Sequence, residues 1–223
     1  MNIEFADVTV KKGDVTVLRD ISIRLSERRI GVIGRNGSGK STFARLFNGI
    51  EVPASGAVLL DGVPERKNLR RHVGFVFQNP DNQIVYPIVE EDLAFGLKNL
   101  KLPKAEIEER IGHAMRSLGL DHLRTRLTHQ LSGGEKQMIA LVGALVMHPR
   151  MIVFDEPTTL LDLWNKQKFM ETINALPQHV VVVSHDLDLL RGFDRIVHIE
   201  AGRIVADGDP AKVLDNYIAS SQC

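Results

Sequence analysis

The chain has 223 residues, of which 43% are hydrophobic and 25% are charged, a composition typical of one globular domain with a substantial core. Lysine plus arginine equals aspartate plus glutamate at 28 each, and this balance argues against a dedicated nucleic-acid binder, which usually carries a basic face. The sole cysteine, Cys223, excludes an intrachain disulfide and fits a reducing compartment. No signal peptide and no apolar run of the roughly 18 residues that span a bilayer are evident, so any membrane role is expected to come through a partner.

The first third of the chain predicts strands and turns. Apolar residues alternate with polar ones from Val8 to Leu25 around a turn at Lys12-Gly13-Asp14. A glycine-rich loop follows the next apolar strand and leads into a helix from about Ser41 to Gly49. The short apolar strands expected in this part are at residues 30–33, 58–60 and 73–77.

The middle of the chain predicts helices. Apolar residues recur at helical spacing between 104 and 118, and a second helix opens at Ser132 and runs to about Met147. Alternation of strands and helices then resumes, with continuous apolar runs at 151–154 and 180–183 that are typical of parallel strands covered on both faces. The pattern indicates an α/β core interrupted by a helical insert.

The segment Gly34-Arg35-Asn36-Gly37-Ser38-Gly39-Lys40-Ser41-Thr42 matches the phosphate-loop pattern. Its glycines let backbone amides approach phosphate oxygens, and the helix that follows directs its N-terminal amides at the same anion. Lys40 is expected to contact the β- and γ-phosphates, and the Ser41 hydroxyl to coordinate Mg²⁺. Because the loop joins an apolar strand to a helix, this interpretation is favoured over a merely flexible loop.

Two carboxylates follow the apolar strand at 151–154. Asp155 at the strand tip suits a contact to Mg²⁺, directly or through water, and Glu156 could act as the general base that polarises the attacking water. Two acidic residues after a strand usually mark only the start of a loop. In a chain that also has a phosphate loop, the catalytic interpretation is preferred.

A second glycine pair at a helix start, within Leu131-Ser132-Gly133-Gly134-Glu135, separates this chain from most phosphate-loop enzymes. It predicts another anion site at a helix N-terminus, although an ordinary helix capped by Ser132 would also explain the pattern. With these motifs the sequence resembles the ABC ATPase family, whose signature reads Leu-Ser-Gly-Gly-Gln or a close variant. The resemblance implies that Ser132, Gly133, Gly134 and Glu135 meet the γ-phosphate of ATP held by the opposite protomer of a dimer.

The resemblance covers essentially the whole chain and implies further roles. Gln78 matches the Q-loop residue that senses Mg²⁺ and the γ-phosphate, His185 the switch histidine, and Asp162 the acidic residue of the D-loop. The implied fold is a RecA-like phosphate-loop core with an N-terminal antiparallel β subdomain and an inserted α-helical subdomain. We expect the core to comprise residues 1–78 and 149–223 and the helical subdomain residues 79–148.

Two segments depart from the family pattern. Lys11 and Lys12 fill the stretch where the family usually places an aromatic residue that stacks on adenine, so looser adenine binding is expected. Leu161 stands in the D-loop where glycine is common, which affects the expected detail of the dimer interface.

A more specific resemblance lies in Gln78-Asn79-Pro80-Asp81-Asn82-Gln83 and in the stretch at 90–96. Both are similar to ATPases of energy-coupling-factor importers for vitamins and metals, and most of all to the short ATPase of dedicated biotin importers, followed by cobalt or nickel systems. The resemblance implies that residues 80–100 help form a groove for a transmembrane subunit. An amphipathic helix with solvated charges would be the simpler explanation.

The resemblance therefore implies an ATP- and Mg²⁺-dependent hydrolase that works as a homodimer on the cytoplasmic face of the membrane. Its expected partners are an integral-membrane scaffold (T-type) subunit and a substrate-binding (S-type) membrane subunit, with no nucleic acid. Two alternatives stay open: the ATPase of a conventional ABC importer or lipoprotein-releasing complex, and a non-transport ABC switch.

Overall fold

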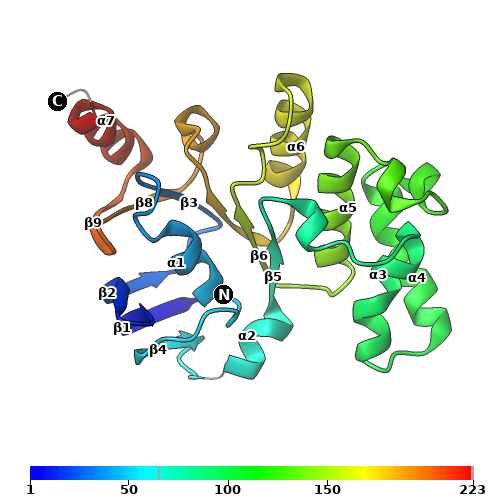
Figure 1. Ribbon diagram of the computed structural model, residues 1–223, viewed down its shortest axis with the longest axis horizontal. Helices are drawn as coiled ribbons and strands as arrows, with labels where there is room; N and C mark the ends of the chain where they lie inside the picture. Colours follow the sequence, from blue (N-terminus) through cyan, green and yellow to red (C-terminus); the bar gives the residue numbers. More distant parts are fainter. Residues whose placement is uncertain (65, 222–223) are drawn as a thin grey trace. The chain divides into compact units, whose positions relative to one another are not determined.

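The computed structural model describes residues 1–64 and 66–221 and forms two compact units (Figure 1). The first unit comprises Met1–Phe75, Arg150–Glu156 and the chain from Pro177 onward. The second comprises Val76–Pro149 and Pro157–Leu176. Each unit is built around its own set of buried apolar side chains.

The first unit contains a three-stranded antiparallel sheet with the order β2-β1-β4. Its strands are β1 (Ile3–Lys12), β2 (Val15–Leu25) and β4 (Ser55–Leu60). Ile3 and Phe5 of β1 are buried on one face, as are Val8 and Val10 beyond a register shift, which matches the period of a strand on each side of that shift. Phe5 on that face packs against Phe43 and Phe47, with ring centroids 4.8 and 5.0 Å away. This sheet therefore packs against the helix that follows the glycine-rich loop.

A six-stranded sheet carries the rest of the first unit, in the order β5-β6-β7-β3-β8-β9. Strand β3 pairs in parallel with β7 and β8, β6 pairs in parallel with β7, and β9 is antiparallel to β8. Strands β3, β6 and β7 are almost wholly buried, which explains their unbroken apolar sequences. The strands are β3 (Arg29–Ile33), β5 (Val73–Val76), β6 (Met151–Asp155), β7 (His179–Val183), β8 (Arg195–Glu200) and β9 (Arg203–Gly208).

Helices of the first unit lie beside these sheets. Helix α1 (Lys40–Leu46) contacts β6 and β7, and α7 (Pro210–Ser221) packs on β8 and β9. Tyr217 of α7 meets the ring of His198 on β8 at 4.8 Å between centroids. The remaining helices of the unit are α2 (Arg66–His72) and the short η4 (Leu187–Leu190).

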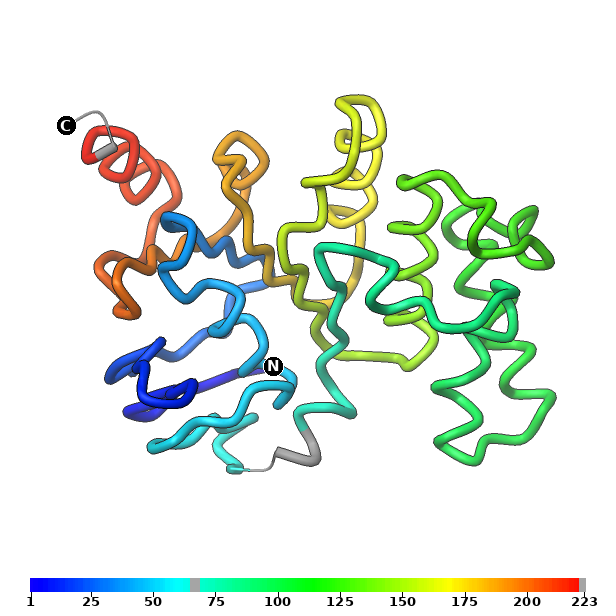
Figure 2. Tube along the Cα trace, viewed as in Figure 1, coloured from blue at the N-terminus to red at the C-terminus, as the bar shows by residue number. Residues whose placement is uncertain are grey.

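The second unit is helical (Figure 2). Helices α3, α4 and α5 pack on one another, and α6 packs on α5. Their shared core includes Leu93, Ile111, Met115, Ile139 and Val142. The helices are η1 (Pro80–Asn82), α3 (Val89–Asn99), α4 (Lys104–Ser117), η2 (Asp121–Leu123), η3 (Thr128–Gln130), α5 (Gly133–Leu145) and α6 (Leu163–Ala175).

The structure groups the chain somewhat differently from the sequence, since the helical unit begins at Val76 and its first segment ends at Pro149. Residues 157–176, which the sequence placed with the core, group with the helical unit. The division of the chain into domains at 78/79 and 148/149 otherwise stays a prediction. Among the residues that the structure describes, no helix has both the length and the apolar character needed to cross a membrane.

Candidate nucleotide site

The glycine-rich loop leaves β3 at Ile33 and enters α1 at Lys40. Gly34, Gly37 and Gly39 have φ angles of 145°, 78° and 108°, a region that side chains disfavour. At Gly34 a Cβ atom would also lie 2.1 Å from the carbonyl oxygen of Ile199. The loop can therefore take this path only because these positions are glycine.

The loop contains a buried polar group that finds no hydrogen-bond partner among the residues that the structure describes. Ser38 is 6% exposed, and its hydroxyl has no hydrogen-bond partner, although its backbone carbonyl accepts a bond from the Gly202 amide. Asn36 and Gly37 beside it are exposed, whereas Thr42 is buried at the start of α1. A buried hydroxyl without a partner is costly, and a phosphate oxygen is an acceptor that would satisfy it.

Lys40 is buried under the loop, with 6% of its surface exposed. Its ammonium group donates to the carbonyl oxygens of Gly34 and Arg35, at 2.8 and 3.1 Å. Burial lowers the pKa of Lys40, while the carboxylates of Glu156 and Asp155 act in the opposite direction. The Lys40 ammonium group therefore lies beneath the loop, where it could bind an anion.

The tip of β6 places Asp155 against Ser41. The Ser41 hydroxyl donates to the Asp155 carboxylate at 2.8 Å, and Arg45 lies 3.8 Å from the same carboxylate. Burial raises the pKa of Asp155, and the Ser41 hydrogen bond and the charges of Arg45 and Lys40 oppose that rise. A hydroxyl and a carboxylate side by side are oxygen ligands of the kind that Mg²⁺ prefers, so these residues fit that ion.

Glu156 and His185 form a direct pair. Nδ1 of His185 lies 2.7 Å from a carboxylate oxygen of Glu156, and the His185 amide donates to the same oxygen at 3.4 Å. Glu156 is 8% exposed, whereas 63% of the His185 side chain is exposed. Glu156 also has a φ of 51°, a strained backbone for a residue with a side chain, as is often found at functional sites.

The sequence predicted both residues of this pair but not the contact between them. The signal that could have revealed it is the pairing of β6 with β7, in which Asp155 lies opposite Val183. The residues just beyond those strand ends therefore meet at the same edge of the sheet.

In the second unit, Ser132 caps α5 in a reciprocal arrangement. The Ser132 amide and hydroxyl both donate to one carboxylate oxygen of Glu135, at 2.8 and 2.7 Å. The Glu135 amide donates to the Ser132 hydroxyl oxygen at 3.3 Å. The ordinary capped helix considered from the sequence is therefore present, and Gly133 and Gly134 form its first turn.

The D-loop lies beside this helix start. Asp162 caps α6 by accepting from the Asn165 amide at 2.8 Å, and it accepts from the Asn165 side chain at 2.9 Å. A Cβ atom on Gly134 would lie 3.0 Å from the Asn165 side chain. Asn165, which the sequence did not single out, thus connects the two segments within the helical unit, and no local sequence pattern would have revealed it.

Gln78 lies on an exposed turn just before η1, also in the helical unit. Two side-chain contacts connect the segment after Gln78 to α5. Asp81 pairs with Lys136 at 2.7 Å, and the Gln83 side chain donates to the Ala140 carbonyl at 2.7 Å. The first unit therefore gathers Lys40, Ser41, Asp155, Glu156 and His185, and the second carries Gln78, the Ser132 segment and Asp162.

The fold and this site define a class of protein. Strands β3, β6 and β7 are neighbours in a parallel sheet, and beyond their carboxyl ends lie a phosphate loop, two acidic residues and a histidine. Such an edge is where open α/β sheets bind ligands. These features define a phosphate-loop nucleoside-triphosphate hydrolase.

The sequence model of the ABC transporter family matches residues 18–159, and the chain belongs to this family. A putative ABC transporter ATP-binding protein of Deinococcus radiodurans is 56% identical over 218 residues, 96% of each chain. A biotin transport ATP-binding protein of Rhizobium etli is 43% identical over 97% of this chain and 98% of its own. An energy-coupling factor transporter ATP-binding protein of Methanoculleus marisnigri is 42% identical over 95% of this chain and 80% of its own.

Solved structures agree with the fold. A Clostridium perfringens protein described as part of the ABC transporter complex cbiONQ is 33% identical, with a TM-score of 0.85 over 99% of this chain and 93% of its own. A dimeric bacterial ABC transporter cassette is 26% identical, with a TM-score of 0.80 over 93% of this chain and 98% of its own. The predicted fold class is confirmed, and ATP hydrolysis coupled to transport is the activity of this family and of this chain.

Proposed function

We propose that the residues gathered in the first unit bind and hydrolyse ATP with Mg²⁺. The observation that carries this proposal is the pairing of Ser41 with Asp155 and of Glu156 with His185 at one edge of the sheet. Gly34, Asn36, Gly37, Ser38, Gly39, Lys40, Ser41 and Thr42 hold the phosphates. Ser41, Asp155 and, from the helical unit, Gln78 hold Mg²⁺, which when bound would stabilise the charge that develops on the phosphate oxygens.

Hydrolysis then follows from the chemistry of the pair. Glu156 accepts a proton from a water molecule as that water attacks the γ-phosphate. His185, which contacts the Glu156 carboxylate, orients the base and stabilises the charge on the phosphate oxygens. Lys40, buried under the loop, supplies positive charge to the bound phosphates.

ABC ATPases dimerise, and we propose that this chain forms a homodimer with two composite sites. All of the catalytic residues are present in one chain, so no unlike partner is required to complete a site. In each site, the segment Ser132-Gly133-Gly134-Glu135 of one protomer faces the γ-phosphate held by the other, with the serine and the two glycines as its donors. Asp162 lies at the contact between protomers. Release of the γ-phosphate removes the bridging group and opens the dimer.

Replacement of Glu156 by Gln tests this assignment. The variant should bind ATP normally, lose at least about 100-fold in turnover and accumulate as a dimer in the presence of ATP. Steady-state hydrolysis and light scattering measure the two effects. Turnover at the level of the unaltered protein would reject the role of Glu156.

We further propose that the surface around residues 80–100 receives a membrane subunit. Val85, Tyr86, Phe95 and Leu100 are 66%, 39%, 43% and 43% exposed, and the rings of Tyr86 and Phe95 touch with centroids 5.3 Å apart. Exposed apolar side chains that touch, as Tyr86 and Phe95 do, are typical of interaction sites. They support docking over the simpler reading of a helix with solvated charges.

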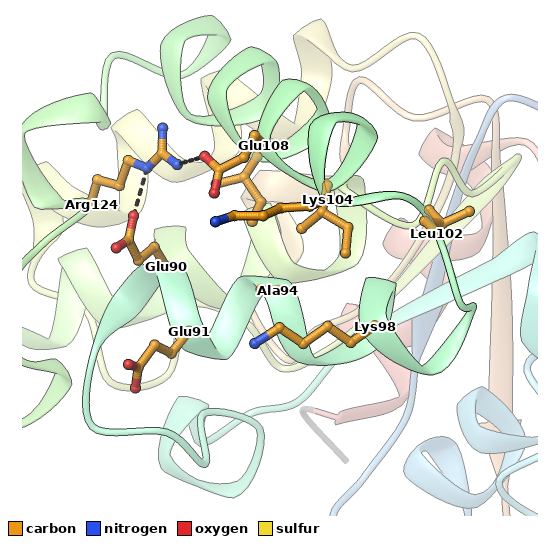
Figure 3. A pocket seen from close by; sticks show the side chains of 10 residues that line it. Glu90, Glu91, Ala94, Lys98, Leu102, Lys104, Glu108 and Arg124 are labelled. Atoms are coloured by element: carbon orange, nitrogen blue, oxygen red, sulfur yellow. Dashed lines mark hydrogen bonds and ion pairs between the residues drawn. The ribbon is translucent and has the colours of Figure 1, made fainter.

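A pocket of about 360 Å³ lies between α3 and α4 in the same region (Figure 3). Arg124 bonds to both Glu90 and Glu108, and Lys98 and Lys104 line the pocket from the two helices. Ala94 and Ile107 are among its apolar lining residues. An apolar lining with charged groups suits an inserted segment of a partner protein.

The membrane complex that we propose is an energy-coupling-factor importer with a scaffold (T-type) subunit and a substrate-binding (S-type) subunit. Biotin is the favoured substrate, because relatives 43% identical over almost their whole length are named biotin transport proteins. The chain then acts as a peripheral protein on the cytoplasmic face of the membrane. Cobalt or nickel is the next candidate, on the strength of the sequence resemblance to importers of those metals.

Affinity purification of the tagged protein from membranes in mild detergent tests the partners. A small membrane solute binder and a separate scaffold subunit are expected, and binding of biotin by the isolated binder would identify the substrate. Replacing Tyr86 and Phe95 by Ser should abolish co-purification while ATP hydrolysis persists. Ser at Val205 on β9, which is even more exposed, should have no effect. Ordinary permease subunits would support a conventional importer, and no membrane protein at all would support a non-transport switch.

A further inference from the structure

The Glu135 side chain occupies donors that Ser132 would otherwise offer to an anion. One of its carboxylate oxygens accepts from both the amide and the hydroxyl of Ser132. The amides of Gly133 and Gly134, in contrast, have no partner among residues 1–64 and 66–221. At the start of α5, therefore, the serine is engaged inside its own helix while the two glycine amides stay available.

The Glu135 carboxylate that accepts these hydrogen bonds is negatively charged. Hydrogen bonds from the amide and hydroxyl of Ser132 lower the pKa of Glu135, and the nearby Arg126 acts in the same direction, whereas partial burial opposes the shift. Glu135 is therefore ionised at neutral pH. A reciprocal cap at a helix start needs only an acceptor at this position, and a glutamine amide serves as well as a carboxylate. The charge is thus not required to form the helix.

We propose that Glu135 restrains Ser132 and thereby raises the ATP concentration at which the dimer closes. The inference rests on the proposed function, in which the Ser132 end of α5 meets the γ-phosphate held by the partner protomer. The triphosphate and the Glu135 carboxylate are both anions that compete for the same donors and the same positive helix end. Closure requires the carboxylate to release the Ser132 hydroxyl, and the carboxylate can recapture it once the γ-phosphate has left. Glu135 is a positioning residue that acts through Ser132.

The test compares two proteins in which hydrolysis is blocked. Glu156→Gln alone and Glu156→Gln with Glu135→Gln are titrated with Mg²⁺-ATP, and the dimer fraction is measured by sedimentation velocity. The second protein should reach half-maximal dimer at roughly one-tenth of the ATP concentration, as expected for loss of a repulsion between close charges. The difference should shrink when ionic strength rises from about 0.05 M to about 0.5 M, because salt screens charges. Equal ATP dependence at low salt would overturn the proposal.

Matched variants distinguish the effect of the Glu135 charge from effects on the folding of the helix start. Glu109→Gln removes another exposed glutamate of the helical unit and should leave the titration unchanged. Glu135→Ala removes the charge and also the side-chain acceptor of the reciprocal cap, and this variant should still close at lower ATP than the parent despite a weaker helix start. If both Glu135 variants close only at higher ATP than the parent, Glu135 supports the closed dimer and the proposal is wrong. If the Glu156→Gln parent forms no dimer with ATP, the proposed function itself fails, and this inference fails with it.

Discussion

Burial changes the pKa of one carboxylate in the site, that of Asp155. It is 3% exposed, and burial raises its pKa above the ordinary aspartate value. Between the unfolded and folded pKa values the native protein binds more protons than the unfolded chain, so stability rises as the pH falls through the folded pKa. At neutral pH the ionised carboxylate therefore destabilises the nucleotide-free protein.

Replacement of Asp155 by Asn should stabilise the nucleotide-free protein at neutral pH by about 1 kcal/mol, because the amide keeps an acceptor for Ser41 without the buried charge. The same change should abolish Mg²⁺-dependent turnover. Urea unfolding in a chelator, with hydrolysis assays alongside, measures both effects. A clear loss of stability would show that the Arg45 pairing outweighs burial.

Lys40 is expected to supply much of the affinity for the triphosphate. Its replacement by Ala removes the buried positive charge beneath the loop and should weaken ATP binding by roughly 100-fold. Fluorescence titration with a labelled ATP analogue provides the measurement, and thermal unfolding shows whether the loop still folds. Unchanged affinity in a folded variant would contradict the assignment of the phosphate loop.

At the scale of elements, the start of α5 and the start of α6 are in contact through one side chain. A Cβ on Gly134 would press on Asn165, which Asp162 holds in place, whereas a Cβ on Gly133 would make only an ordinary contact of 3.7 Å with the Leu160 carbonyl. Gly134 therefore sits at the contact between the two helix starts, and Gly133 provides a natural comparison.

Gly134→Ala should accordingly destabilise the protein by about 1–3 kcal/mol and weaken ATP-dependent closure, and Gly133→Ala should affect stability much less. Adding Asn165→Ala to Gly134→Ala should recover part of the lost stability, because it removes the atoms that the new methyl group meets. Urea unfolding of the unaltered protein, Gly134→Ala, Asn165→Ala and the double variant gives this coupling. Strictly additive effects would mean that Gly134 and Asn165 do not interact.

The elements with regular local patterns were predictable from the sequence, and others were not. The strands at 30–33, 151–154 and 180–183 and the helices starting near 104 and 132 were predicted close to their observed bounds. Helix α6 was not predicted from the sequence. Leu163 and Trp164 in its first turn are 81% and 70% exposed, so only a short apolar stripe remains to indicate a helix. Its grouping with the helical unit arises from packing on α5, which no local pattern encodes.

The same distinction holds within the site. Motifs such as the phosphate loop are contiguous, and their residues are recognisable from spacing alone. The contacts Glu156–His185 and Asn165–Gly134 join residues far apart in the chain, and they depend on strand pairing and helix packing. Sequence reasoning therefore identified the chemical groups of the site but not which of them touch.

At the scale of the whole molecule, composite sites make a prediction about mixed dimers. A Lys40→Ala protomer keeps an intact Ser132 segment, and a Ser132→Arg protomer keeps an intact phosphate loop. Each variant alone should be inactive, but an equal mixture should form hybrid dimers with one complete site and regain up to about a quarter of full hydrolysis. Hydrolysis measured across mixing ratios provides the test, and no recovery at any ratio would argue that each site lies within one chain.

The sheet order has a consequence for how the protein responds to warming. Strand β7 lies between β6 and β3, so its amides are bonded on both sides and are shielded until the whole unit unfolds. The cap of α5 is a short exposed segment held by a few hydrogen bonds, and segments of this kind exchange their amide protons through small local openings. Deuterium uptake should thus be rapid at Ser132 and extremely slow at Val181 and Val182. On heating, dimerisation should therefore be lost at a lower temperature than nucleotide binding.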